Sequence, residues 1–314
     1  MSKLSIIIPV YYNEMNLHDL YVDLNQKVLS KVKDYELIFV DDGSQDKSYE
    51  IIHELSKEDK NIRSLKLSRN FGSHAAILAG LNACTGDCAV MKTADLQEPS
   101  EMILEMYQKW IEGNNVVLAI RSDRNDSAVS NFFSNLYYKI IRQFVLKTMP
   151  LGGFDCFLID RKVIEVLRGM DEKNTSLMGQ ILWAGFKTDK IYYTRLKREK
   201  GKSRWTLQKK IKLVIDSVLS FTHLPVRIMT VIGLSFFFFS LLWAAYLIYL
   251  RVFGGINLEG WTTLMVFNLF SSGLILLMLG IVGEYLWRNF DATRTRPVYI
   301  VEESSFNDKK QKRS

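Results

Sequence analysis

Three short polar stretches contain the residues best suited to chemistry. They are PVYYNE at residues 9–14, DDGS at residues 41–44 and TADLQEP at residues 93–99. Their carboxylate and amide oxygens can accept hydrogen bonds from a ligand. A single D-D-G-S run is also common turn chemistry. Two acidic stretches at corresponding places in a fold are a stronger indication of a ligand site.

Each polar stretch directly follows an apolar run that is typical of a strand. Strands are predicted at 4–10, 36–40, 62–67, 88–92 and 116–120, and helices at 15–29, 48–57, 73–83 and 100–112. This alternation predicts an α/β fold with a mostly parallel sheet and helices on both faces. Ligands of such sheets bind beyond the carboxyl ends of the strands, where the three stretches should meet.

Charge and motifs limit the classes of ligand. The formal net charge is +7, which suits a nucleic-acid binder or a protein that faces anionic lipid and phosphate. No short basic arm or nucleic-acid motif is present, so nucleic acid is not an expected partner. There is no G-x-G-x-x-G motif, and Gly201-Lys202-Ser203 lacks the upstream glycine of a P-loop.

The cysteines and the N-terminus predict a cytosolic domain. Cys84, Cys88 and Cys156 form neither a disulfide framework nor a zinc-binding pattern, so we expect reduced thiols in the core. The first apolar run, at 4–10, is too short for the apolar region of a signal peptide.

Two apolar segments predict a transmembrane hairpin near the C-terminus. Residues 228–250 and 261–283 contain no charged residue, and each exceeds the ~20 residues that cross a bilayer core. Both flanks are more basic than the connector at 251–260. The positive-inside rule therefore predicts a multi-pass protein of the cell (inner) membrane with both termini in the cytoplasm.

The segment at 207–224 has the pattern of an amphipathic helix. Its apolar residues recur at helical spacing and lysines occupy the other face, as in helices that lie in the lipid headgroup layer. An ordinary surface helix packed on the domain is the alternative. The predicted organisation is a cytosolic domain (1–205), an interfacial helix (206–225), two transmembrane helices (226–290) and a cytosolic tail (291–314).

The order of the motifs carries a specific resemblance. P-V-Y-Y-N-E-x-N-L, D-D-G-S, S-R-N-F-G and A-D-L-Q-E-P follow one another as in family 2 glycosyltransferases of the Rossmann-like GT-A type. The later run Arg195-x-x-Arg198-x-x-Gly201-x-Ser203-Arg204-Trp205, the two spans and R-P-V-Y-I-V-E-E resemble the bacterial polyprenyl-phosphate glycosyltransferases. These are relatives of dolichol-phosphate-mannose synthase and the bactoprenol glucosyltransferases. The similarity extends from about residue 4 to residue 303.

The resemblance implies a nucleotide-sugar site at the first loops. The residues that would hold the base and ribose are Pro9, Tyr11, Glu14, Asp41 and Asp42, and Arg69 and Gly72 would approach the nucleotide. The two carboxylates suit this role because they accept hydrogen bonds. Alternatively, the Asp41–Asp42 pair forms a turn that caps the next helix.

The resemblance also implies a divalent cation, Mg²⁺ or Mn²⁺. Asp95 would ligate the cation between the two nucleotide phosphates, with Gln97 as a neighbouring ligand, because such cations prefer hard oxygen ligands. The cation would neutralise charge on the departing nucleoside diphosphate. Thr93 occupies a position where many relatives have aspartate. A neutral hydroxyl is a weaker ligand, so the expected result is lower metal affinity, greater reliance on the nucleotide phosphates, or lost activity.

On the acceptor side, the resemblance implies a polyprenyl phosphate. A phosphate monoester is already an oxyanion near pH 7, so its main obstacle is repulsion from the diphosphate. The residues predicted to hold its phosphate are Arg121, Arg198, Ser203 and Arg204. A solvated basic face attracted to anionic lipid is the alternative. Asp155 stands at a position often assigned a catalytic role, as Asp95 does, whereas Phe157 replaces an arginine of many relatives.

These features together predict the reaction. It is an inverting transfer of one sugar from UDP-glucose or a UDP-N-acetylhexosamine to undecaprenyl phosphate, which makes a lipid-linked sugar donor for cell-envelope glycans. A processive polysaccharide synthase is disfavoured, because Gly201 replaces the glutamine of the Q-x-x-R-W element and two spans cannot enclose a channel. A scaffold without turnover is the other alternative, suggested by Thr93 and Phe157. Relatives suggest a homotetramer.

Overall fold

The chain divides into two units that differ in chemistry. In the computed structural model, one unit comprises residues 1–217 and 296–314, and the other comprises residues 218–295. The structure describes residues 2–122, 152–170, 175–196, 224–253, 260–294 and 296–306, together with a few isolated residues between these ranges.

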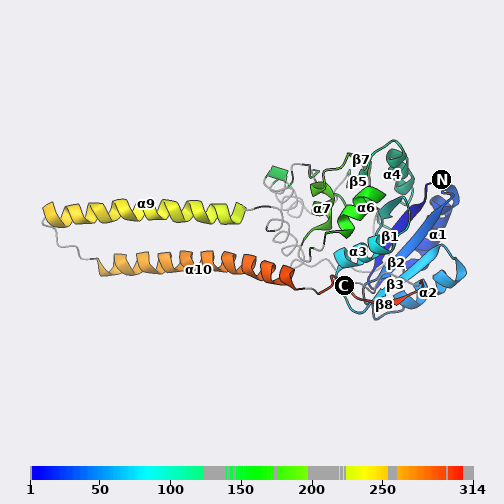
Figure 1. The fold of residues 1–314 in the computed structure, drawn as a ribbon, viewed down its shortest axis with the longest axis horizontal. Coiled ribbons are helices and arrows are strands. Elements are labelled where there is room, and N and C mark those ends of the chain that lie inside the picture. Colours follow the sequence, from blue (N-terminus) through cyan, green and yellow to red (C-terminus); the bar gives the residue numbers. More distant parts are fainter. Residues whose placement is uncertain are drawn as a thin grey trace. The chain divides into compact units, whose positions relative to one another are not determined.

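An eight-stranded mixed sheet forms the centre of the first unit (Figure 1). In spatial order its strands are β7 (Thr188–Tyr193), β5 (Val116–Arg121), β6 (Cys156–Asp160), β4 (Cys88–Met91), β1 (Leu4–Val10), β2 (Tyr35–Asp41), β3 (Ile62–Leu67) and β8 (Val301–Ser304). Strand β6 runs antiparallel to β4 and β5, and β8 runs antiparallel to β3, while the other pairs are parallel. This mostly parallel sheet confirms the predicted α/β fold.

Helices cover both faces of the sheet. They are α1 (Leu17–Lys27), the 3₁₀ turn η1 (Leu29–Lys31), α2 (Ser48–Glu58), α3 (Ser73–Ala83), α4 (Met102–Ile111), α6 (Arg161–Arg168) and α7 (Leu177–Trp183). The five strands and four helices predicted from the sequence all form, with ends shifted by at most two residues. Strands β6 to β8 and helices α6 and α7 are additional.

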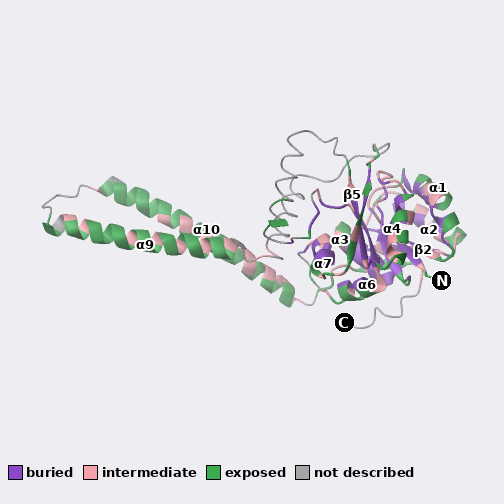
Figure 2. Cartoon of the chain, turned by 90° about the horizontal axis from the view of Figure 1, so that it is seen from above, coloured by how far each residue is buried: buried purple, intermediate pink, exposed green. Residues whose placement is uncertain are grey.

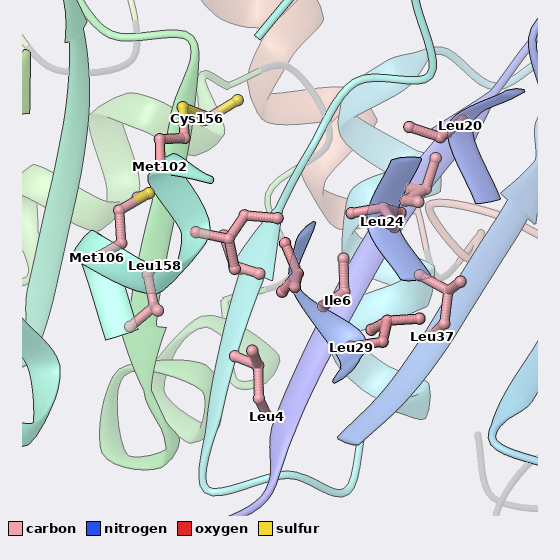
Figure 3. Packing of buried hydrophobic residues seen from close by; sticks show 14 of the residues in the cluster. Leu4, Ile6, Leu20, Leu24, Leu29, Leu37, Met102, Met106, Cys156 and Leu158 are labelled. Carbon is pink, nitrogen blue, oxygen red and sulfur yellow. The ribbon is translucent and has the colours of Figure 1, made fainter. Parts of the chain in front are cut away.

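Alternating residues of the central strands serve the two faces. Leu4, Ile6 and Ile8 of β1 belong to one buried cluster with residues of α1, α2 and α4, shown in part in Figure 3. Ile7 points to the other face, where α3 crosses so closely that a Cβ on Gly80 would lie 2.4 Å from the Ile7 side chain. Such two-sided burial explains the continuous apolar runs of the central strands. Cys84, Cys88 and Cys156 are buried free thiols, as predicted.

The last strand comes from the C-terminal end of the chain. Strand β8 pairs with the outer edge of β3, and Lys66 forms ion pairs with Glu302 (3.2 Å) and Glu303 (3.1 Å). The Arg63 guanidinium lies 3.7 Å from the ring centroid of Phe306. Residues that follow the apolar helices in sequence therefore complete the central sheet.

The second unit consists of two long apolar helices, α9 (Leu224–Phe253) and α10 (Trp261–Thr293). Segments Pro225–Leu250 and Thr263–Thr293 are long and apolar enough to cross a membrane, and their most apolar windows are not buried within the protein. Figure 2 shows their outward surfaces as exposed, in contrast to the buried strands. Phe236 stacks on Phe267 and Phe270, which holds the two helices together. The predicted apolar hairpin is confirmed.

Candidate active site

The loops after β1, β2 and β3 interlock at the carboxyl edge of the sheet. The Asp42 carboxylate accepts hydrogen bonds from the backbone N–H groups of Phe71 (2.7 Å) and Gly72 (2.9 Å). Gly43 has φ +69°, and a Cβ there would lie 2.4 Å from the Arg69 carbonyl carbon. Only glycine allows this approach. The predicted nucleotide loops are therefore brought together by Asp42 itself.

The loop after β1 is held by the start of α2. Ser44 Oγ accepts from the Tyr12 N–H (3.0 Å), and Glu14 accepts from the Lys47 N–H (2.9 Å). Tyr12 has φ +55°, a left-handed conformation that costs a non-glycine residue about 1–2 kcal/mol. Strain of this kind is concentrated at functional sites in proteins.

Asp41 is wholly buried beneath these loops. Its Oδ2 accepts from the Ser44 N–H (3.1 Å), whereas its Oδ1 is buried without a hydrogen-bond partner among the described residues. Burial raises the pKa of Asp41, although the hydrogen bonds from Ser44 oppose this. Asp41 thus stabilises the turn through Oδ2, and its Oδ1 can accept a hydrogen bond from a bound ligand.

The loop after β4 contains a chain of polar contacts around Thr93. The Thr93 hydroxyl contacts Asp95 Oδ1 (2.7 Å) and, more closely, the Glu98 carboxylate. Glu98 is buried, and the fully buried Lys92 ammonium donates to its backbone oxygen (2.7 Å). Burial raises the pKa of Glu98, with the nearby Lys92 charge acting in the opposite direction. Thr93 thus links the two carboxyl groups.

Gln97 joins this loop to the segment that follows β7. Arg195 Nη2 donates to Gln97 Oε1 and lies 4.0 Å from Asp95 Oδ2. The Leu196 N–H donates to the Gln97 backbone oxygen (2.9 Å), and Gln97 Nε2 donates to the Leu196 backbone oxygen (3.3 Å). Leu96, between the two predicted metal ligands, has φ +54°. Arg195 was not among the predicted site residues, although it begins the R-x-x-R motif.

The oxygen atoms near Asp95 suit a hard cation but do not enclose one. Asp95 offers a carboxylate and Gln97 an amide oxygen, which are ligands that Mg²⁺ and Mn²⁺ accept. Among the described residues, no group of three or more His, Cys, Asp or Glu side chains converges on one point. These residues therefore fit a cation that takes its other ligands from water and a bound diphosphate.

A second ionic cluster lies at the ends of β5 and β7. Asp155 accepts hydrogen bonds from Arg121 Nε and from the Tyr193 hydroxyl (2.9 Å). Burial lowers the pKa of Arg121, but the Asp155 charge outweighs it and the net pKa is raised. Burial and Asp155 both raise the pKa of Tyr193. The Asp155 charge contributes to the raised pKa of Glu98, and Asp155 precedes β6, which pairs with β4, so this cluster lies close to the Asp95 loop.

The remaining predicted residues have different environments. Pro9 lies within β1, and the exposed Arg69 stacks on Phe71 at 4.0 Å. Phe157 is 1% exposed in β6 and packs edge-on against Phe154, so it is a core residue. Asp160 caps α6 by accepting from the Lys162 N–H (2.9 Å). Arg198, Ser203, Arg204 and most of the predicted interfacial helix lie outside the described residues.

Known proteins resemble this sequence over nearly the whole chain. A Bacillus subtilis protein named uncharacterized glycosyltransferase YkcC is 36% identical, covering 96% of this chain and 93% of its own length. The prophage bactoprenol glucosyl transferase homolog of Escherichia coli K12 is 32% identical, with 96% and 98% covered. The bactoprenol glucosyl transferase of Shigella phage SfX is 32% identical, with 96% and 99% covered.

The fold, the acidic loops and these relatives define a glycosyltransferase. The family model for glycosyl transferase family 2 matches residues 5–168, just over half of the chain. The protein belongs to glycosyl transferase family 2. Among solved structures, a mannosyltransferase from Pyrobaculum calidifontis in complex with GDP-Man and Mn²⁺ is 14% identical with a TM-score of 0.47, covering 63% of this chain and 57% of that one.

Proposed function

We propose that the protein transfers one sugar, with inversion, from a UDP-sugar to undecaprenyl phosphate at the cytoplasmic face of the cell membrane. The product is a lipid-linked sugar for cell-envelope glycans. The observation that carries the proposal is the combination, in one family 2 chain, of polar loops at the carboxyl edge of the sheet and two membrane-length helices. Relatives named bactoprenol glucosyl transferase match nearly the full chain, which supports a lipid acceptor.

The proposed binding of the nucleotide is supported by the buried aspartates at the end of β2, Asp41 and Asp42. Asp41 Oδ1 is an acceptor without a partner among the described residues, and the uracil ring offers an N–H donor. Asp42 and the residues it binds, Phe71 and Gly72, give the loop after β3 its shape. Pro9, Tyr11, Glu14 and Arg69 remain predicted contacts of the nucleotide.

The acceptor assignment is supported by Arg121 and Asp155. Arg121 is a cation at any physiological pH, as arginine side chains are, so it can attract a phosphate monoester. Tyr193 and Asp155 fix the direction of its guanidinium. Arg198, Ser203 and Arg204 are proposed to complete the phosphate site. A divalent cation held by Asp95 and Gln97 would supply positive charge to the leaving diphosphate when bound.

The connectivity of the sheet supports a topology that places both flanks of the hairpin on the same side of the membrane. Strand β7 precedes α9 in the chain, and β8 follows α10, yet both strands belong to one sheet. Because both strands belong to one folded domain, the chain between them must cross the membrane an even number of times. Two spans meet this requirement. The basic flanks of the hairpin, which the positive-inside rule assigns to the cytoplasm, agree with this topology. The homotetramer suggested by relatives stays a prediction.

The test uses membranes that contain the wild-type protein or Asp95→Ala. They are incubated with undecaprenyl phosphate and radiolabelled nucleotide sugars, and label is measured in the organic-extractable lipid. We expect label from one UDP-sugar, which is lost in the variant and after chelation of divalent cations. If no nucleotide sugar gives labelled lipid in the presence of Mg²⁺ or Mn²⁺, the transferase proposal is wrong. Normal UDP-sugar binding without product would then favour the scaffold alternative.

A further inference from the structure

Arg195 occupies the place where a cation would meet the predicted metal ligands. Its Nη2 donates to Gln97 Oε1 and lies 4.0 Å from Asp95 Oδ2. The other end of the Gln97 amide, Nε2, donates to the Leu196 backbone oxygen. Because a guanidinium only donates hydrogen bonds and a backbone carbonyl only accepts them, these two contacts fix the Gln97 oxygen as the atom that faces Arg195. The oxygen that the sequence assigns to a metal is thus bound to a protein cation.

The same guanidinium carries a donor that its surroundings leave unused. Arg195 Nε is buried and has no hydrogen-bond partner among the described residues. A buried N–H of a charged group without an acceptor is unfavourable, so the site is incomplete without another acceptor. Arginine binds phosphate through two parallel N–H donors, and Nε together with one terminal nitrogen forms such a pair.

A metal ion and the Arg195 guanidinium compete for the same oxygen atoms of Gln97 and Asp95. A divalent cation bound by Asp95 and Gln97 would need the Gln97 oxygen that Arg195 now engages. It would also be repelled by a like charge only a few ångströms away. A diphosphate removes both obstacles, because its oxygens can accept from Arg195 and can ligate the cation.

We propose that Arg195 couples the binding of the nucleotide diphosphate to that of the divalent cation. In the nucleotide-free protein, Arg195 holds Gln97 and shields Asp95. On binding, its guanidinium passes to a phosphate oxygen, and Gln97 and Asp95 become available to the cation. This inference rests on the proposed function, because it takes the ligand to be a nucleoside diphosphate. Arg195 is a positioning residue for the cation and a binding residue for the diphosphate.

Linkage makes the coupling measurable. If the nucleotide strengthens cation binding, the cation strengthens nucleotide binding by the same factor. We expect UDP to raise the Mn²⁺ affinity of the wild-type protein by about tenfold, within the usual range for coupled sites. In Arg195→Met, the nucleotide-free protein should bind Mn²⁺ several-fold more tightly than wild type, and the gain from UDP should largely disappear.

The experiment titrates Mn²⁺ into full-length protein in detergent and follows the electron paramagnetic resonance signal of unbound Mn²⁺, with and without UDP, GDP or ADP. Lys190→Met is the matched control, because it removes one positive charge from an exposed position on β7. We expect this control to behave as wild type. The melting temperature of each variant verifies folding.

Three outcomes decide the matter. If Arg195→Met retains both the weak Mn²⁺ binding of the nucleotide-free protein and the full gain from UDP, the coupling role is wrong. If no nucleotide changes the Mn²⁺ affinity of wild type, the coupling is also wrong, and lipid labelling in the same preparation judges the transferase separately. If GDP or ADP produces the gain instead of UDP, and the variant loses it, the coupling is upheld and the UDP assignment is wrong.

Discussion

Two clusters that pair carboxylates with arginine lie at opposite edges of the sheet. At the amino edge, the buried Glu36 accepts from Ser5 Oγ (2.7 Å), from Arg63 Nη1 (2.9 Å) and from both the backbone and the hydroxyl of Thr85. At the carboxyl edge, Asp95 accepts from Thr93, and Arg195 spans Gln97 and Asp95 with one buried donor unused. Similar groups are therefore arranged in two different ways.

The difference separates a structural cluster from a binding cluster. The Glu36 cluster satisfies its charged groups within the protein, as folded proteins do with nearly all buried polar groups. At the carboxyl edge, Asp41 Oδ1 and Arg195 Nε have no hydrogen-bond partner among the residues that the structure describes, and Tyr12 and Leu96 are left-handed. Such incomplete hydrogen bonding and strain are expected where a ligand completes the site.

Removing the carboxylate of the structural cluster should have the largest effect on stability. In Glu36→Ala, Arg63 loses its buried partner, and breaking a buried ion pair costs about 3–5 kcal/mol. We expect a large fall in the midpoint of thermal unfolding, with the activity of the remaining folded protein unchanged. Glu36→Gln, which retains part of the hydrogen bonding, should lie between. If Glu36→Ala were as stable as wild type, the Glu36 cluster would not be a structural cluster.

Removing the carboxylate of the binding cluster should affect transfer instead. Asp95→Ala should reduce the rate of glycolipid formation by roughly 10²–10³-fold, the usual effect of losing one electrostatic stabiliser. Its unfolding midpoint should stay near that of wild type. Asp34→Ala, an exposed aspartate before β2, serves as the control. A marked loss of stability in Asp95→Ala would mean that both clusters are structural.

Glu36 and His74 should each make the stability of the protein depend on pH, in two different pH ranges. Burial acts to raise the pKa of Glu36, but hydrogen bonds from Ser5, Thr85 and Arg63 outweigh it and hold the pKa at about 2. The unfolded chain binds this proton near pH 4.5, so stability falls as the pH drops from about 4.5 towards 2. Burial lowers the pKa of His74 to about 4 from 6.5, and its loss of stability therefore begins below pH 6.5.

Two variants test these windows. Thermal unfolding midpoints measured from pH 7 to pH 3 should fall less steeply in Glu36→Gln below pH 4.5, and less steeply in His74→Gln between pH 6.5 and 4. The amide oxygen of the substituted glutamine can still accept from the Leu177 N–H, as His74 Nδ1 does at 3.1 Å. Profiles that run parallel to wild type in both variants would contradict the assignment.

The smallest effect is expected at Tyr193. Tyr193→Phe removes one hydrogen bond to Asp155, worth about 1 kcal/mol, and loosens the orientation of Arg121. We expect the KM for undecaprenyl phosphate to rise about fivefold, which corresponds to that energy, while the KM for the nucleotide sugar stays constant. Tyr192→Phe is the control, since that side chain is 66% exposed on the same strand. An equal change in both KM values would argue against an acceptor role.

The sequence pattern predicted strands β1 to β5 of the sheet, but it did not predict the edge strand β8. Strands β1 to β5 are apolar runs followed by turn residues, so sequence shows their positions within a residue or so. Strand β8 has the sequence VEES and is mostly exposed, and only its pairing with β3, more than 230 residues away in the chain, makes it a strand. The contact between Arg195 and Gln97 likewise depends on distant segments and leaves no local signal.

The place of β8 in the sheet also has a consequence for biogenesis. On the ribosome, β3 is made early, but its partner β8 emerges only after α9 and α10 have been synthesised. Until then β3 presents an unpaired edge, a surface that invites pairing with other chains. The catalytic sheet is therefore finished last, after the cell has had the opportunity to insert the hairpin. A chain arrested before residue 296 would keep this edge open and become a substrate for chaperones and proteases.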